Sequence, residues 1–253
     1  MQITDNTILV TGGSSGIGQA LAEALHRLNN QVIIAGRRQS ALDKVTAANP
    51  GMQSTLLDME DAATFPAFAA TMAARFPTLN VLVNNAGIQQ PENLLSPLEN
   101  WAAMEAMVTT NLLGPMRLTS VMLPLLLRHK LSTVINVTSS LAFVPGVGVP
   151  TYCATKAAMH SYTQSLRRQL GQTSVSVIEI IPPYVQTNLG PGHGTDPRAM
   201  PLADFITETM AILRDNPEAT EVVVERSKPL RFAAEQGRYD AMFKGLNEAM
   251  WSA

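Results

Sequence analysis

Tyr152 and Lys156 are the residues in this sequence that are best suited to acid–base chemistry. They are four residues apart, so they lie one turn apart on the same face if the segment is helical. A free phenol titrates near pH ~10, about three units above neutrality, which corresponds to roughly 4 kcal/mol. An ammonium group about 5 Å away supplies roughly 3 kcal/mol of that difference in a medium of intermediate dielectric constant. The pair therefore predicts a tyrosine whose pKa is lowered for proton transfer.

A glycine-rich segment, Thr-Gly-Gly-Ser-Ser-Gly-Ile-Gly at residues 11–18, lies between an apolar run and a helical pattern. Gly12 suits a tight turn, Gly16 lets the backbone approach a pyrophosphate, and Gly18 permits close packing of helix on strand. Free N–H groups at the helix start then face phosphate oxygens. The candidate contacts are Gly12, Ser14, Ser15, Gly16, Ile17 and Gly18. A purely structural turn is the alternative, but the position between strand and helix favours nucleotide binding.

Two arginines follow the second apolar run. Sites specific for NAD place Asp or Glu near this point to bind the ribose 2′-hydroxyl, whereas a nearby Arg suits a 2′-phosphate. No acidic residue occurs between Asn29 and Ser40, whereas Arg37 and Arg38 are both present. Ser40 and Asp43 resemble a capping box, so a helix is expected to begin just after the arginines. Two cations at that position face the positive end of the helix dipole, which is unfavourable. The sequence therefore favours NADP(H) over NAD(H).

The elements that must position these residues follow from the apolar pattern. Short apolar runs cover residues 7–10, 31–34, 53–57, 80–83, 133–137, 175–181 and 221–225, and helical patterns cover residues 17–28, 152–170 and 202–214. Strands that alternate with helices indicate βαβ units, and continuous apolar strands indicate a parallel sheet covered on both faces. We expect one α/β domain over residues 1–253, a doubly wound parallel sheet (Rossmann fold) of about seven strands with helices on both faces.

Composition argues against several other classes of protein. The chain has 18 Lys and Arg against 20 Asp and Glu, a net charge of −2, which disfavours nucleic acid as a partner. Cys153 is the only cysteine, which excludes an intramolecular disulfide and a thiolate-rich metal site, and no two histidines have ligand spacing. No apolar run approaches the ~18 residues of a membrane span, and no signal peptide is visible. We expect a cytoplasmic protein with no metal and no membrane partner.

Taken together, the motifs resemble the short-chain dehydrogenase/reductase family, in its single-domain branch. The resemblance rests on residues 11–18, Asn84-Asn85-Ala86-Gly87, Asn111, Ser139, Tyr152, Lys156 and the segment from Pro182 to Thr187. It implies an oxidoreductase that transfers a hydride between a nicotinamide and a small-molecule carbonyl or secondary alcohol. It also implies a homodimer or homotetramer.

The resemblance implies a role for each catalytic residue. Tyr152 is the general acid/base, Lys156 lowers its pKa and holds the nicotinamide ribose, and Ser139 hydrogen-bonds the substrate oxygen. Asn111 holds a water that links Lys156 to solvent. The thirteen-residue spacing to Tyr152 favours Ser139 over its neighbour Ser140, which then becomes a pocket residue.

Further cofactor contacts come from the ends of other strands. Asp58 would accept a hydrogen bond from the adenine amino group, with a helix cap as an equal alternative. Thr187 would bind the nicotinamide carboxamide, and Val185 would offer it a backbone group. The remaining contacts implied are Asn85, Ala86, Gly87 and Pro182.

Two segments that carry no Asp, Glu, Lys or Arg, residues 137–155 and 183–195, are expected to line the substrate pocket. Pockets for phosphate or carboxylate use Arg or Lys, so we expect a neutral, largely apolar carbonyl or secondary alcohol. Arg198 would change this expectation if it turned inward. The candidate substrate contacts are Ser140, Phe143, Tyr184 and His193. Residues 183–219 are the expected substrate loop or lid.

Two departures from the family pattern stand out. Pro183 occupies a position that is commonly glycine, and residues 226–253 form a helical tail in place of a glycine-rich ending. The tail and residues 196–201 resemble a bacterial subgroup named after D-alanylation of teichoic acid. A nicotinamide-binding redox sensor or interaction protein with little turnover is the alternative function. Such proteins commonly lack the tyrosine–lysine pair, so its presence favours an enzyme.

Overall fold

The computed structural model describes residues 1–95, 101–190 and 194–250. In these residues one parallel sheet has the strand order β3-β2-β1-β4-β5-β6-β7. The strands are β1 (Thr7–Thr11), β2 (Gln31–Gly36), β3 (Gln53–Leu56), β4 (Leu79–Asn84), β5 (Ser132–Val137), β6 (Val175–Ile180) and β7 (Glu221–Val222). Each apolar run of the sequence therefore overlaps one strand, and the predicted doubly wound sheet is confirmed.

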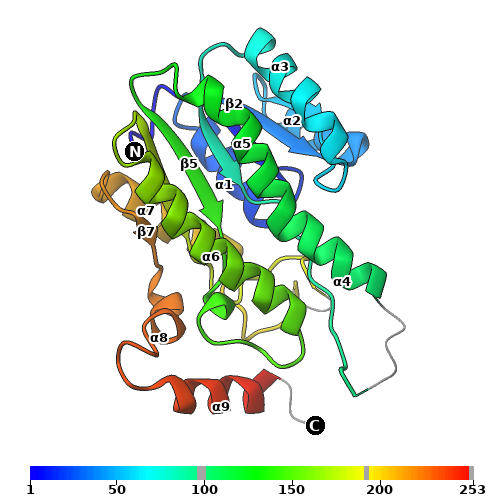
Figure 1. Ribbon diagram of the computed structural model, residues 1–253, viewed down its shortest axis with the longest axis vertical. Helices are drawn as coiled ribbons and strands as arrows, with labels where there is room; N and C mark the ends of the chain where they lie inside the picture. The colour runs from blue at the N-terminus through cyan, green and yellow to red at the C-terminus, as the bar shows by residue number, and fades with distance from the viewer. Residues whose placement is uncertain (96–100, 191–193, 251–253) are drawn as a thin grey trace.

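Helices cover both faces of the sheet (Figure 1). They are α1 (Gly16–His26), α2 (Gln39–Ala48), α3 (Phe65–Arg75), α4 (Trp101–Val108), α5 (Gly114–Leu126), α6 (Pro150–Leu170), α7 (Leu202–Asp215), α8 (Lys228–Arg231) and α9 (Tyr239–Met250). Short 3-10 segments are η1 (Ala62–Thr64), η3 (Ser140–Ala142) and η4 (Glu225–Ser227), and η2 (Thr109–Leu113) is a π-helix. Helices α1, α2 and α7 pack on one face, and α3, α5 and α6 pack on the other.

Neighbouring residues of one strand bury their side chains in different cores. In β1, Ile8 and Val10 join the core under α1 and α7, whereas Leu9 joins the core under α3 and α5. All three are fully buried. Because successive side chains point to opposite faces of a sheet, a strand covered on both faces must be apolar throughout.

The order of the strands determines where a ligand can bind. β1 lies between β2 and β4, so the chain leaves β1 toward one edge of the sheet and later returns to fill the other side. This reversal opens a crevice at the carboxyl ends of the central strands, where open α/β sheets bind their ligands.

One local prediction is wrong. Helix α2 begins at Gln39 with Arg38 in the N-cap position, and no side chain caps it. Ser40 therefore lies inside the helix, and Asp43 accepts a hydrogen bond of 2.7 Å from the Gln39 side chain instead of completing a capping box. In the described part of the chain, no helix combines the length and apolar character that crossing a membrane requires.

Candidate active site

A cavity of about 360 Å³ lies at the carboxyl ends of β1, β4, β5 and β6. It brings together many of the residues expected to bind cofactor and substrate. Those that line it are Gly12, Ser15, Gly16, Ile17, Asn85, Ala86, Gly87, Ser139, Ser140, Tyr152, Lys156, Pro182, Tyr184, Val185 and Thr187. One cavity thus runs from the glycine-rich turn to the tyrosine–lysine pair.

The glycine-rich turn needs its glycines for steric reasons. Gly12 has φ +66°, and a Cβ there would lie 2.9 Å from the Ala86 Cα. A Cβ on Gly18 would lie 2.4 Å from the Gly12 carbonyl oxygen, which confirms the close packing expected at that position. Ser15 precedes α1 without a side-chain cap hydrogen bond, so the first N–H groups of the helix stay available for a ligand.

The segment after β4 is fastened to the end of β1 through Thr11. The Thr11 hydroxyl accepts hydrogen bonds from the backbone N–H groups of Asn85 (3.0 Å) and Ala86 (3.1 Å). The Asn85 side chain donates back to the Thr11 carbonyl oxygen at 2.9 Å. These contacts hold the Asn-Asn-Ala-Gly motif against the glycine-rich turn and keep both at the same wall of the cavity.

Asn111 lies in η2, the π-helix between α4 and α5. Its side chain donates to the Ile88 carbonyl oxygen and accepts from the Ile88 N–H, both at 2.8 Å. It also donates to the Thr155 hydroxyl at 3.3 Å, beside Lys156 on α6. Asn111 therefore connects the segment after β4 with the helix that carries the tyrosine and lysine, and it does not itself line the cavity. Single π turns inside α-helices frequently occur at functional sites.

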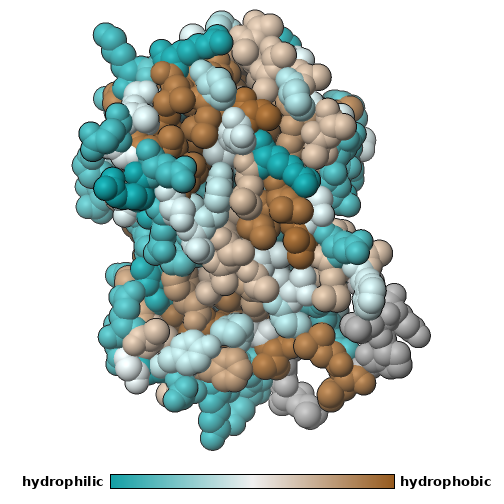
Figure 2. Space-filling view, viewed as in Figure 1, coloured by the Kyte–Doolittle hydropathy of each residue, from teal (hydrophilic) through white to brown (hydrophobic). Residues whose placement is uncertain are grey.

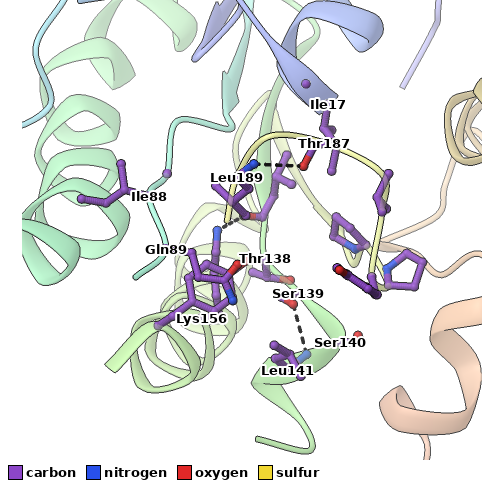
Figure 3. A pocket seen from close by; sticks show the side chains of 18 of the residues that line it. Ile17, Ile88, Gln89, Thr138, Ser139, Ser140, Leu141, Lys156, Thr187 and Leu189 are labelled. Atoms are coloured by element: carbon purple, nitrogen blue, oxygen red, sulfur yellow. Dashed lines mark hydrogen bonds between the residues drawn. The ribbon is translucent and has the colours of Figure 1, made fainter. Parts of the chain in front are cut away.

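Ser139 and Tyr152 face the same part of the cavity. Ser139 follows β5, and its hydroxyl accepts a hydrogen bond from the Leu141 N–H at 3.1 Å (Figure 3). Burial raises the pKa of Tyr152 well above its usual value, and a hydrogen bond with the Ser139 side chain lowers it only in part. The expected lowering of the tyrosine pKa is therefore wrong for the protein groups by themselves, because loss of hydration disfavours the phenolate.

Lys156 is buried one helical turn after Tyr152. Its Nζ lies 5.6 Å from the centre of the Tyr152 ring and donates a hydrogen bond of 2.9 Å to the Val137 carbonyl oxygen. Burial lowers the pKa of Lys156 to about 8, and the negative charge of Glu179 partly opposes that shift. The spacing prediction is thus confirmed in geometry, since the ammonium group and the phenol share one face of α6.

The predicted adenosine-side residues lie beyond the cavity. Arg37 follows β2 and forms a 3.0 Å salt bridge with Glu60, in which both side chains are well exposed. Arg38 is exposed beside it. The Asp58 carboxylate accepts a hydrogen bond from the Glu60 N–H at 3.0 Å, which is a local turn contact. Sequence reasoning missed Glu60, because the residue lies far from Arg37 in the sequence and meets it only at the end of β3.

The substrate candidates divide into three groups. Ser140 and Tyr184 line the cavity, and the Tyr184 hydroxyl donates a 3.0 Å hydrogen bond to Asp196. Phe143 does not line it, because its ring packs edge-on against His160 and beneath the Arg231 guanidinium, each at 4.6 Å. His193 is outside the described residues. Arg198 does not line the cavity either, since its guanidinium forms a salt bridge of 2.6 Å with Asp196.

Sequence reasoning missed three cavity residues of the C-terminal tail and three that follow the Asn-Asn-Ala-Gly motif, Ile88, Gln89 and Gln90. The tail residues Leu230, Leu246 and Met250 come from α8 and α9. Gln89 is buried, and both Gln89 and Lys156 line the cavity (Figure 3). The helical period of the tail indicated an apolar face, but it carried no signal for the surface that this face would cover.

A family model, related sequences and a solved structure were each found to be similar to this chain. A family model described as short chain dehydrogenase matches residues 6–197. The uncharacterized oxidoreductase DltE of Bacillus subtilis is 36% identical, over 98% of this chain and 98% of its own. An NADP-dependent 3-hydroxy acid dehydrogenase of Schizosaccharomyces pombe is 30% identical over 74% of each chain. A short chain dehydrogenase from Burkholderia cenocepacia, solved in complex with NADP, has a TM-score of 0.81 at 23% identity, covering 97% of this chain and 99% of that chain.

The family match covers the glycine-rich turn, the Asn-Asn-Ala-Gly motif and the tyrosine–lysine helix, and the similarity to DltE extends through the C-terminal tail. The resemblance expected from the motifs is therefore confirmed. With its parallel sheet and its shared cavity, this chain belongs to the short-chain dehydrogenase family of oxidoreductases.

Proposed function

We propose that this protein is an NADPH-dependent oxidoreductase that transfers a hydride between nicotinamide and a neutral, largely apolar carbonyl or secondary alcohol. Tyr152 acts as the general acid/base. The observation that carries this proposal is that Ser139, Tyr152 and Lys156 line the same cavity as the glycine-rich turn. A cofactor bound along that turn would present its reactive ring to the tyrosine.

The chain's own residues fit a dinucleotide. The uncapped start of α1 offers backbone N–H groups to a pyrophosphate, and the positive φ of Gly12 keeps the turn open. Thr187 lies across this turn, since a Cβ on Gly16 would be 3.5 Å from its side chain. Lys156 and Thr187 would hold the nicotinamide end of the cofactor. When bound, the nicotinamide supplies or accepts the hydride.

Side chains of the protein would carry out the proton transfer that accompanies the hydride transfer. In carbonyl reduction Tyr152 donates its phenolic proton to the substrate oxygen, and Ser139 donates a hydrogen bond to the same oxygen. The Lys156 ammonium group, 5.6 Å from the tyrosine ring, offsets the negative charge that develops on the phenolate. Asn111 would hold the water through which Lys156 exchanges protons with solvent.

The preference for NADP(H) rests on Arg37 and Arg38. The salt bridge between Arg37 and Glu60 is exposed, and such pairs contribute little stability. A 2′-phosphate, with up to two negative charges, would therefore displace Glu60 and bind both arginines. The NADP dependence of the Schizosaccharomyces pombe relative and the NADP bound to the Burkholderia structure support the same preference.

The substrate class follows from the far end of the cavity. Its apolar lining residues include Leu141, Leu189, Leu230, Leu246 and Met250, and Arg198 is engaged by Asp196 and does not line the cavity. An anionic substrate would find no guanidinium there among the described residues. Residues 183–219, which contribute Tyr184 and Leu189, would serve as the substrate loop.

The decisive experiment measures NADPH and NADH oxidation against a panel of apolar ketones, aldehydes and quinones, with Tyr152→Phe assayed in parallel. We expect turnover with NADPH that falls at least a hundredfold in Tyr152→Phe, because the variant has lost the proton donor. Binding of NADPH, followed by fluorescence, should be unchanged. Equal activity of variant and parent would disprove the assignment. NADPH binding with no turnover across the panel would instead favour a redox sensor or interaction protein.

The predicted homo-oligomer has a candidate surface. Figure 2 shows hydrophobic side chains gathered around α5 and α6. Exposed apolar residues on nearby elements include Trp101, Leu127 and Leu131. Light scattering of the purified protein would distinguish a monomer from the dimer or tetramer that we propose. The cytoplasmic location stays a prediction from the sequence.

A further inference from the structure

A fully buried carboxylate lies beside the catalytic residues and has no role in the proposed chemistry. Glu179 in β6 has no exposed surface. Its two oxygens lie 3.0 and 2.9 Å from His160 Nδ1, and one of them accepts a hydrogen bond of 2.6 Å from the Thr138 hydroxyl. Burying a carboxylate is costly unless it is paired, so a buried group with this many partners calls for an explanation.

Both partners of Glu179 belong to segments that carry catalytic side chains. His160 is on α6, one turn after Lys156 and two turns after Tyr152. Thr138 directly precedes Ser139 and lines the cavity (Figure 3). The Glu179 carboxylate therefore fastens the helix that bears the tyrosine and lysine to the end of β5, which bears the serine.

Other charged groups lie close to Glu179 and His160. Glu221 in β7 accepts hydrogen bonds of 2.8 and 3.0 Å from Arg231 of α8. The ligand atoms of His160, Glu179 and Glu221 lie within 4.8 Å of one another, as a metal site would require. However, the Arg231 guanidinium already binds both oxygens of Glu221, and Arg231 also pairs with Glu235. The cluster is thus a network of protein charges, and the charge of Glu179 within it also acts on the buried Lys156.

We propose that Glu179 is a positioning residue that keeps Lys156 in its charged form and, through His160 and Thr138, holds Lys156 and Ser139 in their relative places. Burial favours the neutral amine of Lys156 and lowers its pKa, whereas the charge of Glu179 raises it. Without the carboxylate, Lys156 would lose its proton at lower pH. It would then cease to stabilise the Tyr152 phenolate.

The test is Glu179→Gln, which keeps the shape of the side chain and can still hydrogen-bond both Thr138 and His160. Lysine labelled with ¹³C at Cε is titrated by NMR in the full chain without cofactor, and Lys156 is identified by its absence in Lys156→Met. We expect the wild-type signal to titrate near pH 8. In Glu179→Gln it should titrate about 0.5–1 unit lower. Glu235→Gln, which removes an exposed charge on the far side of Arg231, should leave it in place.

An unchanged Lys156 titration in a folded Glu179→Gln variant would overturn the proposal. Should that variant fail to fold, the wild-type titration still tests the proposal, because a Lys156 pKa below about 7 would mean that the amine is neutral in spite of Glu179 and would overturn it. Glu179→Asp keeps the negative charge but shortens the side chain. A Lys156 pKa restored toward the wild-type value in this variant would separate an electrostatic role of Glu179 from a packing role. If a substrate is found, the alkaline limb of the kcat/KM profile should move with the NMR titration. Because the NMR readout needs neither substrate nor cofactor, its outcome is independent of the proposed function.

Discussion

At the scale of single residues, Lys156 has conflicting requirements. The proposed catalysis needs its positive charge near Tyr152, but burial lowers the pKa of Lys156 from 10.5 to about 8. The hydrogen bond to Val137 and the nearby Glu179 carboxylate reduce the cost of burying that charge. The charge that the proposed mechanism requires therefore lowers the stability of the folded protein.

This conflict predicts an unusual dependence of stability on pH. Between pH 8 and 10.5 the unfolded chain keeps the Lys156 proton while the folded chain has lost it, so stability rises with pH over that window. The shift corresponds to about 3 kcal/mol in the free energy of unfolding. Urea unfolding at pH 7 and pH 10.5 measures it, with Lys156→Met as the reference that lacks this contribution. A pH dependence identical in the two proteins would contradict the buried charge.

Cofactor preference is also a property of single residues. In Arg37→Asp the carboxylate would repel a 2′-phosphate, so the Kd for NADPH should rise at least tenfold while the Kd for NADH changes little. Fluorescence titration with both cofactors measures the ratio. Arg27→Asp is a matched control, because Arg27 is exposed at the end of α1, before the amino end of β2, whereas Arg37 follows its carboxyl end. A uniform loss of affinity for both cofactors would refute the role of Arg37.

At the scale of elements, the close approach of α1 to the end of β1 depends on a single glycine. A Cβ on Gly18 would lie 2.3 Å from the Asn85 side-chain nitrogen and 2.4 Å from the Gly12 carbonyl oxygen. Since one of these contacts is backbone, the helix would have to move. That movement would widen the turn on which the cofactor pyrophosphate is proposed to bind.

We therefore expect Gly18→Ala to lower the free energy of unfolding by about 1–3 kcal/mol and to weaken NADPH binding. Gly245→Ala is the matched control, because a Cβ there has open space and α9 is helical. That control should be neutral or slightly stabilising, since alanine favours helix over glycine. Thermal unfolding and cofactor titration of the two variants measure both effects. Equal stability of the two variants would mean that α1 does not pack as tightly as the turn suggests.

At the scale of the whole molecule, the C-terminal tail completes a cavity that is otherwise built from earlier segments. Asn247 of α9 accepts a hydrogen bond of 2.7 Å from the Val147 N–H and donates one of 3.2 Å to the Pro145 carbonyl oxygen. Arg198, paired with Asp196, donates to the Ala249 carbonyl oxygen. These contacts keep Leu246 and Met250 in the lining of the cavity, at its proposed substrate end.

Loosening α9 should therefore affect substrate binding more than chemistry. In Asn247→Ala both hydrogen bonds to residues 145–147 are lost, about 1–2 kcal/mol in total, together with one to the Phe243 carbonyl oxygen within α9. We expect KM for an apolar substrate to rise several-fold, with kcat and NADPH affinity nearly unchanged. Steady-state kinetics provides the measurement, and Asn216→Ala, beyond the end of α7, serves as control. A fall in kcat at constant KM would show that the tail acts on the chemical step instead.

Much of the fold could be predicted from the sequence because its determinants are local or periodic. Buried strands must be apolar throughout, amphipathic helices repeat their apolar residues, and a turn at positive φ needs glycine, so residues 7–18 already indicate strand, turn and helix. The i, i+4 spacing of Tyr152 and Lys156 likewise determined that they share a helical face.

Features that depend on contacts between distant segments could be determined only from the tertiary structure. Glu60 meets Arg37, the charge of Glu179 acts on Lys156, and Leu246 lines a cavity built mostly from earlier segments. In each case the partners are far apart in the sequence. The direction of the Tyr152 pKa shift belongs to the same class, because it depends on how completely the folded chain excludes water from the phenol. Spacing can bring two charges onto one face of a helix, but burial and the partners supplied by other elements determine the strength of their interaction.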